Sequence, residues 1–285
     1  MKKNLIKVLG VNFLIFYNLL IFILFAPSFA YFSFRFLLRN NISNAQFNIK
    51  EKYKKRQDLI GPLIEFEKLS YLYHDYIVWR RKRFNGDYIN INEEGIRQSW
   101  QPLKASNEKY LFLGGSTIFG YGVADNKTIP SIFGKLSEKS VVNLGDTGYT
   151  SRQSLALYIN YLVENKINKS PQINIISYDG ANDIRQKCRT EVKGLETEQQ
   201  SKIREKLNTK YGSINYFMKP WFVIINILKS DKNSLKESFN CHQNPIKAEY
   251  VADTLISTWR TMYKIAESNN HNFTAILQPV IFLEG

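Results

Sequence analysis

The sequence predicts an α/β protein in which helices cover a parallel sheet, with a membrane helix at the N-terminus. From Glu108 onward, short apolar runs alternate with helical patterns, an order typical of parallel sheets wrapped by helices. The first three runs each lead into a turn that contains glycine. No charged residue stands between Lys7 and Arg35, and this stretch provides the ~17–25 residues that cross a bilayer as a helix.

The N-terminal stretch also predicts where the rest of the chain lies. Lys2, Lys3 and Lys7 precede it and favour a cytoplasmic N-terminus. The stretch is longer than the ~7–15-residue apolar core of a cleaved signal peptide, so we expect a membrane anchor. Cleavage after Ala30 stays open, because Ser28 and Ala30 fit a small-x-small cleavage site. In either case we expect the main domain outside the cytoplasm, membrane-anchored or secreted after cleavage.

Charge is the unusual feature of the composition. The 285 residues are 44% hydrophobic and 22% charged, but the net charge is +14. Such an excess indicates an anionic partner, such as a phospholipid head group or an acidic glycan. The chain has no RNA-binding motif, zinc-finger spacing or repeat, so we expect no nucleic acid partner.

The two cysteines, Cys188 and Cys241, do not form a CxxC pair, so they do not indicate a metal site. They form either one disulfide or two free thiols, depending on the compartment. Outside the cytoplasm we expect a disulfide that ties together the two ends of an insertion.

The chain divides into three predicted regions. Residues 1–39 are a cytoplasmic tip with a transmembrane signal-anchor, residues 40–105 are a stalk and an N-terminal lobe, and residues 106–285 are the main domain. Within the lobe, Asn85-Gly86 predicts a tight turn between two short strands. A mostly polar insertion occupies about residues 187–246 of the main domain.

The main domain begins with an apolar strand over 110–113. Pro130 then opens a short helix, and a second strand covers 140–144. A helix over 154–166 leads to a third strand over 173–178. After the insertion, residues 247–268 predict an amphipathic helix, and a fourth strand follows over 273–280. One stripe of that helix carries its apolar residues: Val251, Leu255, Trp259 and Met262.

Three strand ends carry residues suited to catalysis. Ser116 follows the first strand, Gly148 follows the second and Asn182 follows the third. The carboxyl ends of parallel strands share one edge of the sheet, which is where ligands bind. A hydroxyl nucleophile with hydrogen-bond donors beside it is what acyl transfer requires. The alternative for Ser116 is a helix cap in an ordinary turn.

These blocks resemble the motifs of the SGNH hydrolase superfamily, the GDSL-like esterases and lipases. The first block matches Gly114-Gly115-Ser116, the second contains Gly148, and the third, Gly-x-Asn-Asp, matches Gly180 to Asp183. The resemblance covers roughly 108–280. It implies a flavodoxin-like three-layer α/β/α sandwich and an ester hydrolase that uses no metal or organic cofactor. It also implies that Ser116 is the nucleophile, and that Gly148 and Asn182 bind the oxyanion.

The fourth block of the family, Asp-x-x-His, does not occur in the sequence. The histidines are His74, His242 and His271. We expect His271, just before the fourth strand, at the opposite end of the sheet from the site, and the other two at surface or structural positions. The simplest expectation is that the sequence is a piece without the last strand and helix of the domain. Loss of the histidine base can cost about 10⁶ in turnover.

The sequence therefore predicts a membrane-anchored, envelope-facing serine ester hydrolase that acts on O-acyl esters of glycans or lipids. One alternative is a non-catalytic module that binds glycan or lipid on the same fold, and another is an O-acyltransferase. A phosphate- or nucleotide-binding protein is disfavoured, because neither G-x-x-x-x-G-K-[ST] nor G-x-G-x-x-G is present.

Overall fold

The computed structural model describes residues 12–19, 21–22, 25, 49–164, 172–189 and 239–279. Residues 49–205 and 237–285 belong to one compact unit, and residues 1–48 and 206–236 belong to another. The predicted membrane span lies mostly outside the described residues, as does the predicted insertion. The described part of the chain contains no helix with both the length and the apolar character needed to cross a membrane.

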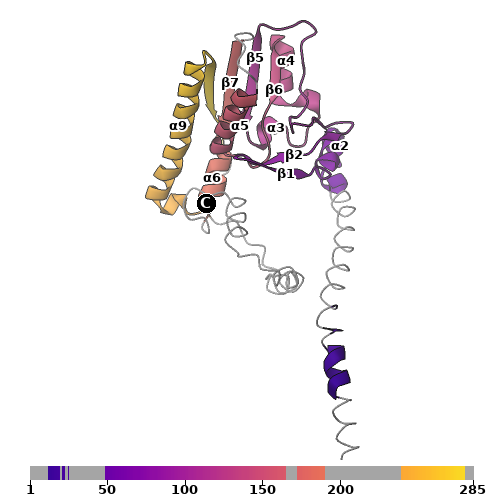
Figure 1. Ribbon diagram of the computed structural model, residues 1–285. Coiled ribbons are helices and arrows are strands. Elements are labelled where there is room, and N and C mark those ends of the chain that lie inside the picture. The colour runs from indigo at the N-terminus through magenta and orange to yellow at the C-terminus, as the bar shows by residue number, and fades with distance from the viewer. Residues whose placement is uncertain are drawn as a thin grey trace, which may run out of the picture. The chain divides into compact units, whose positions relative to one another are not determined.

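The first compact unit is built on four parallel strands (Figure 1). They are β5 (Glu108–Gly114), β6 (Ser140–Asn143), β7 (Gln172–Asp179) and β8 (Asn272–Leu277), and their order across the sheet is β6-β5-β7-β8. Every adjacent pair is parallel. The prediction of an α/β fold with a parallel sheet is thus confirmed.

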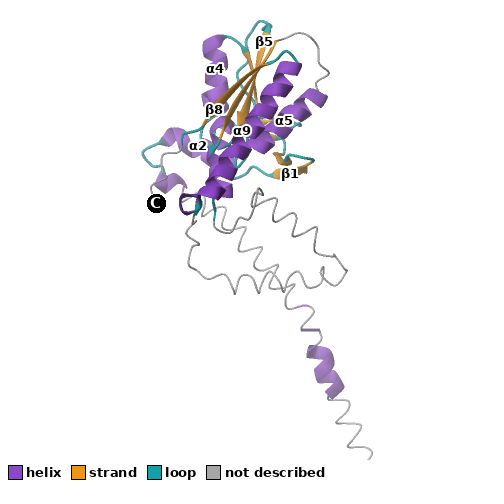
Figure 2. Cartoon of the chain, turned by 90° about the vertical axis from the view of Figure 1, so that its left-hand side faces the viewer, coloured by secondary structure: helices purple, strands orange, loops and turns teal. Residues whose placement is uncertain are grey.

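Helices cover both faces of this sheet (Figure 2). Helices α5 (Ser151–Glu164) and α9 (Pro245–Ser268) lie on one face, and α4 (Ile129–Ser137) lies on the other. Successive residues of a strand point to opposite faces. Accordingly, Leu111 and Leu113 pack in a core cluster with Met262 of α9, whereas Phe112 packs with Val141 in a second cluster.

Most element boundaries differ from the predicted ones by one to three residues, and the largest differences are at α5 and β8. Helix α5 begins at Ser151, three residues before its predicted start, because the buried Asp183 carboxylate accepts a hydrogen bond from the Ser151 backbone N–H at 3.0 Å. This cap comes from a distant part of the chain. Strand β8 ends at Leu277, so Gln278 and Pro279 do not belong to it, and the last predicted residue lies outside the described residues.

Residues 57–91 form a helix and two hairpins. Helix α2 (Gln57–Phe66) comes first, followed by β1 (Tyr71–His74) paired with β2 (Val78–Arg81) and β3 (Phe84–Asn85) paired with β4 (Asn90–Ile91). The predicted turn between two short strands is confirmed, with Gly86 N–H bonded to Ile89 O at 3.0 Å. The β1–β2 hairpin was not predicted. It lies at the lower end of the unit in both views (Figures 1 and 2).

A disulfide joins Cys188 and Cys241, with their Cα atoms 5.2 Å apart. Cys188 follows the last residue of α6 (Ala181–Lys187), and Cys241 begins the short helix η2 (Cys241–Gln243) just before α9. The expected bridge across the insertion is confirmed.

Candidate active site

Three loops meet at the carboxyl edge of the sheet, and each carries one of the predicted site residues. Ser116 follows β5, Gly148 follows β6 and Asn182 follows β7. Because β5 lies between β6 and β7, its loop lies between the other two. In a doubly wound sheet the ligand binds where the strand order reverses, and here that point lies between the ends of β5 and β7.

Two glycines shape the turn that presents Ser116. Gly114 has φ +150°, and a Cβ on it would lie 2.4 Å from the backbone oxygen of Tyr178 in the neighbouring strand. Gly115 precedes α3 (Ser116–Phe119) as its N-cap. Ser116 is half-buried, and its hydroxyl makes no hydrogen bond to any described residue. The turn therefore leaves the hydroxyl available to a substrate.

The second loop holds Gly148 in the left-handed region, at φ +80°. The side-chain amide of Gln186 donates a hydrogen bond to Gly148 O, which fixes the orientation of that peptide group. The backbone N–H of Gly148 has no acceptor among the described residues. It is therefore free to donate to a ligand.

Asn182 connects the third loop to the other two. Its Nδ2 donates a hydrogen bond to Tyr149 O at 2.8 Å, and a Cβ on Gly115 would lie 2.3 Å from the same nitrogen. An amide nitrogen carries two hydrogens, so one hydrogen remains for a ligand. The structure thus brings Asn182 against the turn of Ser116.

The other polar residue of the third block has a different position. Asp183 is fully buried and accepts hydrogen bonds from Ser151 Oγ at 2.7 Å and from Lys187 Nζ at 3.2 Å. These contacts join α6 to the start of α5. Asp183 therefore stabilises the loops around the site and does not face it.

Two buried arginines that precede β5 in the sequence hold these loops, and neither was predicted to do so. The first, Arg81 of β2, is 3% exposed. Its Nε donates to Asp146 Oδ1 at 3.0 Å, and its Nη2 donates to Thr147 Oγ1 at 2.8 Å. Burial raises the pKa of Asp146, and the charge of Arg81 partly offsets this rise. Arg81 thus anchors the loop that carries Gly148.

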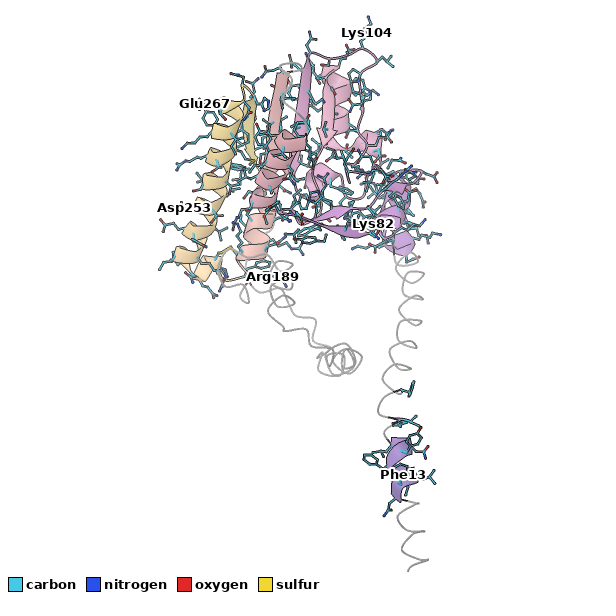
Figure 3. All side chains as sticks on the ribbon, viewed as in Figure 1. Phe13, Lys82, Lys104, Arg189, Asp253 and Glu267 are labelled. Carbon is cyan, nitrogen blue, oxygen red and sulfur yellow. A yellow bond between two sulfur atoms is a disulfide. The ribbon has the colours of Figure 1, made fainter. Side chains whose placement is uncertain are left out.

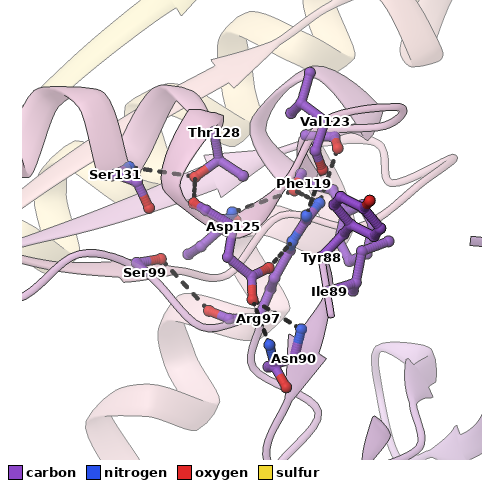
Figure 4. A network of polar contacts seen from close by, with 12 residues as sticks. Tyr88, Ile89, Asn90, Arg97, Ser99, Phe119, Val123, Asp125, Thr128 and Ser131 are labelled. Carbon is purple, nitrogen blue, oxygen red and sulfur yellow. Dashed lines mark hydrogen bonds and ion pairs between the residues drawn. The ribbon is translucent and has the colours of Figure 1, made fainter. Parts of the chain in front are cut away.

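The second buried arginine, Arg97, anchors the C-terminal end of α3, the helix that begins at Ser116 (Figure 4). Its Nη1 donates to the carbonyl oxygens of Phe119 and Gly120, both at 2.8 Å, and its Nη2 donates to Val123 O. Its Nε donates to Asp125 Oδ1 at 2.8 Å. Carbonyl groups at the end of a helix have no partner within the helix, and here Arg97 supplies one.

A further contact to the turn of Ser116 comes from the end of β8. The side-chain amide of Gln278 donates a hydrogen bond to Thr117 Oγ1 at 2.8 Å. Gln278 directly follows Leu277, the last residue of β8. The carboxyl end of the fourth strand therefore also reaches the site.

None of the three histidines makes a hydrogen bond to Ser116. His271 lies at the start of β8, where its Nδ1 is 2.8 Å from the hydroxyl of Tyr158, and burial lowers its pKa. This confirms its expected place at the opposite end of the sheet. His74 lies in the β1–β2 hairpin with Nδ1 at 3.0 Å from Asp75 O, and His242 is exposed in η2.

One acid at the edge of the site has an unusual protonation equilibrium. Asp179, the last residue of β7, is 3% exposed, and burial raises its pKa to about 7. The hydroxyls of Ser154 and Ser177 donate hydrogen bonds to its carboxylate and oppose that rise. Within the described residues, no group of three or more His, Cys, Asp or Glu side chains could hold a metal ion.

No family model and no curated protein matches the chain. Among solved structures, it is similar to a protein assigned to the G-D-S-L lipolytic family from Desulfitobacterium hafniense, with 17% identity over 62% of this chain and 85% of that one, at a TM-score of 0.26. It is also similar to AlinE4, an SGNH-hydrolase family esterase, with 14% identity over 60% and 77% at 0.28.

An acetylxylan esterase from Geobacillus stearothermophilus is similar as well, with 19% identity over 60% of this chain and 76% of that one, at a TM-score of 0.24. These proteins are esterases and SGNH-type hydrolases, the class that the three sequence blocks resemble.

Proposed function

We propose that this chain is a serine ester hydrolase of the SGNH type, on a flavodoxin-like three-layer fold, and that it acts on O-acyl esters of glycans or lipids. One observation carries the proposal. The hydroxyl of Ser116 makes no hydrogen bond to any described residue, and it lies where the strand order of the sheet reverses, between the segments that carry Gly148 and Asn182. A nucleophile flanked by hydrogen-bond donors suits acyl transfer.

In the proposed reaction, Ser116 Oγ attacks the carbonyl carbon of the ester. The oxyanion that forms accepts hydrogen bonds from the backbone N–H groups of Ser116 and Gly148 and from Asn182 Nδ2. Removal of one such donor typically costs about 10²–10³ in rate. The bond between the carbonyl carbon and the alcohol oxygen then breaks, and the alcohol leaves with the proton that Ser116 Oγ gave up. Water attacks the acyl group on Ser116, returns one proton to the serine oxygen and releases the acid.

The proposed location is the cell envelope, outside the cytoplasm. The disulfide between Cys188 and Cys241 supports this location, because such bonds persist in oxidising compartments. The uncharged stretch between Lys7 and Arg35 supports a membrane anchor.

A second candidate function is a non-catalytic module that binds glycan or lipid. It is favoured by one observation: none of the histidines is hydrogen-bonded to Ser116, and the sequence has no Asp-x-x-His. A serine hydrolase without its histidine can lose about 10⁶ in turnover. An O-acyltransferase would use the same nucleophile and donors, with a second alcohol in place of water.

Fluorophosphonate labelling of the full chain tests the proposal. We expect Ser116→Ala to abolish labelling and ester turnover, and Ser257→Ala to preserve both, because Ser257 is an exposed serine on α9. Release of the acyl group to an added alcohol, rather than to water, would identify a transferase. A chain that neither labels nor turns over esters would contradict the hydrolase. It would favour the binding module, whose salt-sensitive binding Ser116→Ala would leave intact.

A further inference from the structure

The tip of the β1–β2 hairpin exposes large side chains beside buried ones. Tyr73 is 70% exposed, Tyr76 is 86% exposed and Leu72 is 53% exposed, whereas Ile77 is fully buried and Trp79 is 8% exposed. A hairpin that served only to cover the core would bury its aromatic rings and expose its polar residues. Packing against the core therefore does not account for the exposed aromatic side chains on the outer surface of this hairpin.

The backbone of the tip is strained, and the strain is held in place. Tyr76 and Val78 have φ values of +63° and +85°, which are uncommon for residues other than glycine, above all β-branched ones. Such conformations persist only where the surroundings hold them, and they cluster at functional sites. Here Gln153 Nε2 donates to Ile77 O at 2.9 Å, and the Tyr149 hydroxyl donates to Trp79 O at 2.6 Å.

These contacts place the hairpin beside the candidate active site. A Cβ on Gly148 would lie 3.7 Å from the ring of Trp79, and the Tyr71 hydroxyl lies 2.9 Å from Thr147 Oγ1. Tyr73 is the ladder partner of Trp79, so their side chains share one face of the hairpin, about 5 Å apart. Trp79 touches the Gly148 loop, and Tyr73 lies directly beside Trp79 on the neighbouring strand.

We propose that Tyr73 and Tyr76, here called the tyrosine platform, bind sugar rings of an acylated glycan next to Ser116. This inference rests on the proposed function, since it assigns the substrate class of the same site. Rigid tyrosines supply contact area at low entropic cost. The net charge of +14 favours a glycan that carries acidic groups.

The chemistry of the tip favours a sugar over a lipid chain. His74 and Asp75 lie between the two tyrosines in sequence, and Asp75 is exposed. Together with the phenol hydroxyls they offer donors and acceptors around the rings, which match the hydroxyl groups of a sugar. An acyl chain would be recognised by a continuous apolar surface, and these polar side chains interrupt it.

Affinity electrophoresis of the full chain, in gels that contain acetylated xylan, polygalacturonate or alginate, tests the platform. The chain carries Ser116→Ala throughout, so that bound glycan is not consumed. The test variants are Tyr73→Ala and Tyr76→Asn, since asparagine tolerates the left-handed backbone. The matched control is Tyr263→Ala. Tyr263 is a 51% exposed tyrosine bonded to Glu267, which lies at the other end of the sheet (Figure 3).

We expect at least one of the polysaccharides to retard the chain. Each platform variant should weaken that binding about 5- to 10-fold, which corresponds to roughly 1.0–1.4 kcal/mol, and the control should bind as the parent does. Equal retardation of the parent and the platform variants would overturn the inference. A second outcome would also overturn the inference: no gel retards the chain, but the chain binds phosphatidylglycerol vesicles and the platform variants do not. The platform would then bind a lipid surface.

Fluorophosphonate labelling of the chain with Ser116 intact reports on the proposed function separately. Glycan binding that the platform variants weaken, without labelling of Ser116, would contradict the proposed hydrolase activity and support the tyrosine platform. Labelling of Ser116, together with glycan binding that the platform variants leave unchanged, would support the proposed hydrolase activity and contradict the tyrosine platform.

Discussion

The side-chain amide of Asn182 occupies the space that a side chain at Gly115 would need: a Cβ there would lie 2.3 Å from Nδ2. The two residues belong to different sequence blocks, 67 positions apart by number (182 − 115). A glycine is therefore required before Ser116 because of Asn182 and not because of its own backbone, whose φ of −85° any residue can adopt.

Gly115→Ala should displace Asn182 and destabilise the fold by about 1–3 kcal/mol, the usual cost of overpacking. Because the steric conflict is with one side chain, its effect should depend on that side chain. In a double-mutant cycle measured by urea unfolding, Asn182→Ala should recover most of the cost of Gly115→Ala. Additive effects of the two substitutions would show that another contact causes the loss.

Arg97→Met should destabilise the protein by about 3–5 kcal/mol, because it leaves the partly buried Asp125 without its charge partner and three carbonyl groups without a donor. Urea unfolding measures this loss. The matched control is Arg83→Met, which breaks an ion pair to Glu93 whose side chains are 58% and 73% exposed. Exposed pairs contribute little, so the control should unfold like the parent, and equal losses in the two variants would refute the anchoring role of Arg97.

Asp179 should make the protein less stable as the pH rises from about 4 to 7. Its pKa is about 7 in the folded chain and ~3.9 when unfolded, so the folded state binds the proton more tightly. The resulting stabilisation is complete below the unfolded pKa and is lost as the pH rises through 7.

Urea unfolding of the parent and of Asp179→Asn across this range measures the effect. The free energy of unfolding of the parent should fall relative to the variant, on the order of 1 kcal/mol per pH unit, and level off above pH 7. A constant difference between pH 4 and 7 would mean that Asp179 is ionised throughout.

Loss of the disulfide should lower stability by about 2–4 kcal/mol, because the bond closes a long loop in the unfolded chain. Cys188 and Cys241 are separated by 53 positions. The double variant Cys188→Ser/Cys241→Ser should have a lower Tm in a thermal melt. Reductant should lower the Tm of the parent and leave the double variant unchanged. Uptake of two thiol labels by the unreduced parent would contradict the bond.

Much of the sheet could be predicted because its two central strands, β5 and β7, are covered on both faces: residues 108–114 and 173–179 are all buried or half-buried. Such strands appear as short apolar runs, as in 110–113 and 173–178, and the structure places β5 and β7 there. The three blocks could also be located, since each glycine-containing turn directly follows such a strand. Periodicity and turn chemistry are local properties, and the sequence displays them without reference to distant residues.

The buried arginines could not be predicted in the same way. Arg81 and Arg97 read as exposed residues, because arginine is almost never fully buried unless it is paired. Their partners lie far away in sequence: Arg81 meets Asp146 65 positions later, and Arg97 meets Phe119 22 positions later. The β1–β2 hairpin escaped prediction for a related reason, since the residues of β1 are largely exposed and show no alternation of burial.

The sequence by itself determined the fold class, the order of the four strands along the chain and the turns that carry Ser116, Gly148 and Asn182. Only the tertiary structure decided that Asn182 lies against Gly115, that Arg81 and Arg97 hold the loops of the site, and that a strained hairpin lies against the loop of Gly148. The physical reason is that local patterns encode which backbone forms, whereas contacts between distant segments arise only when burial selects the partners of each polar group.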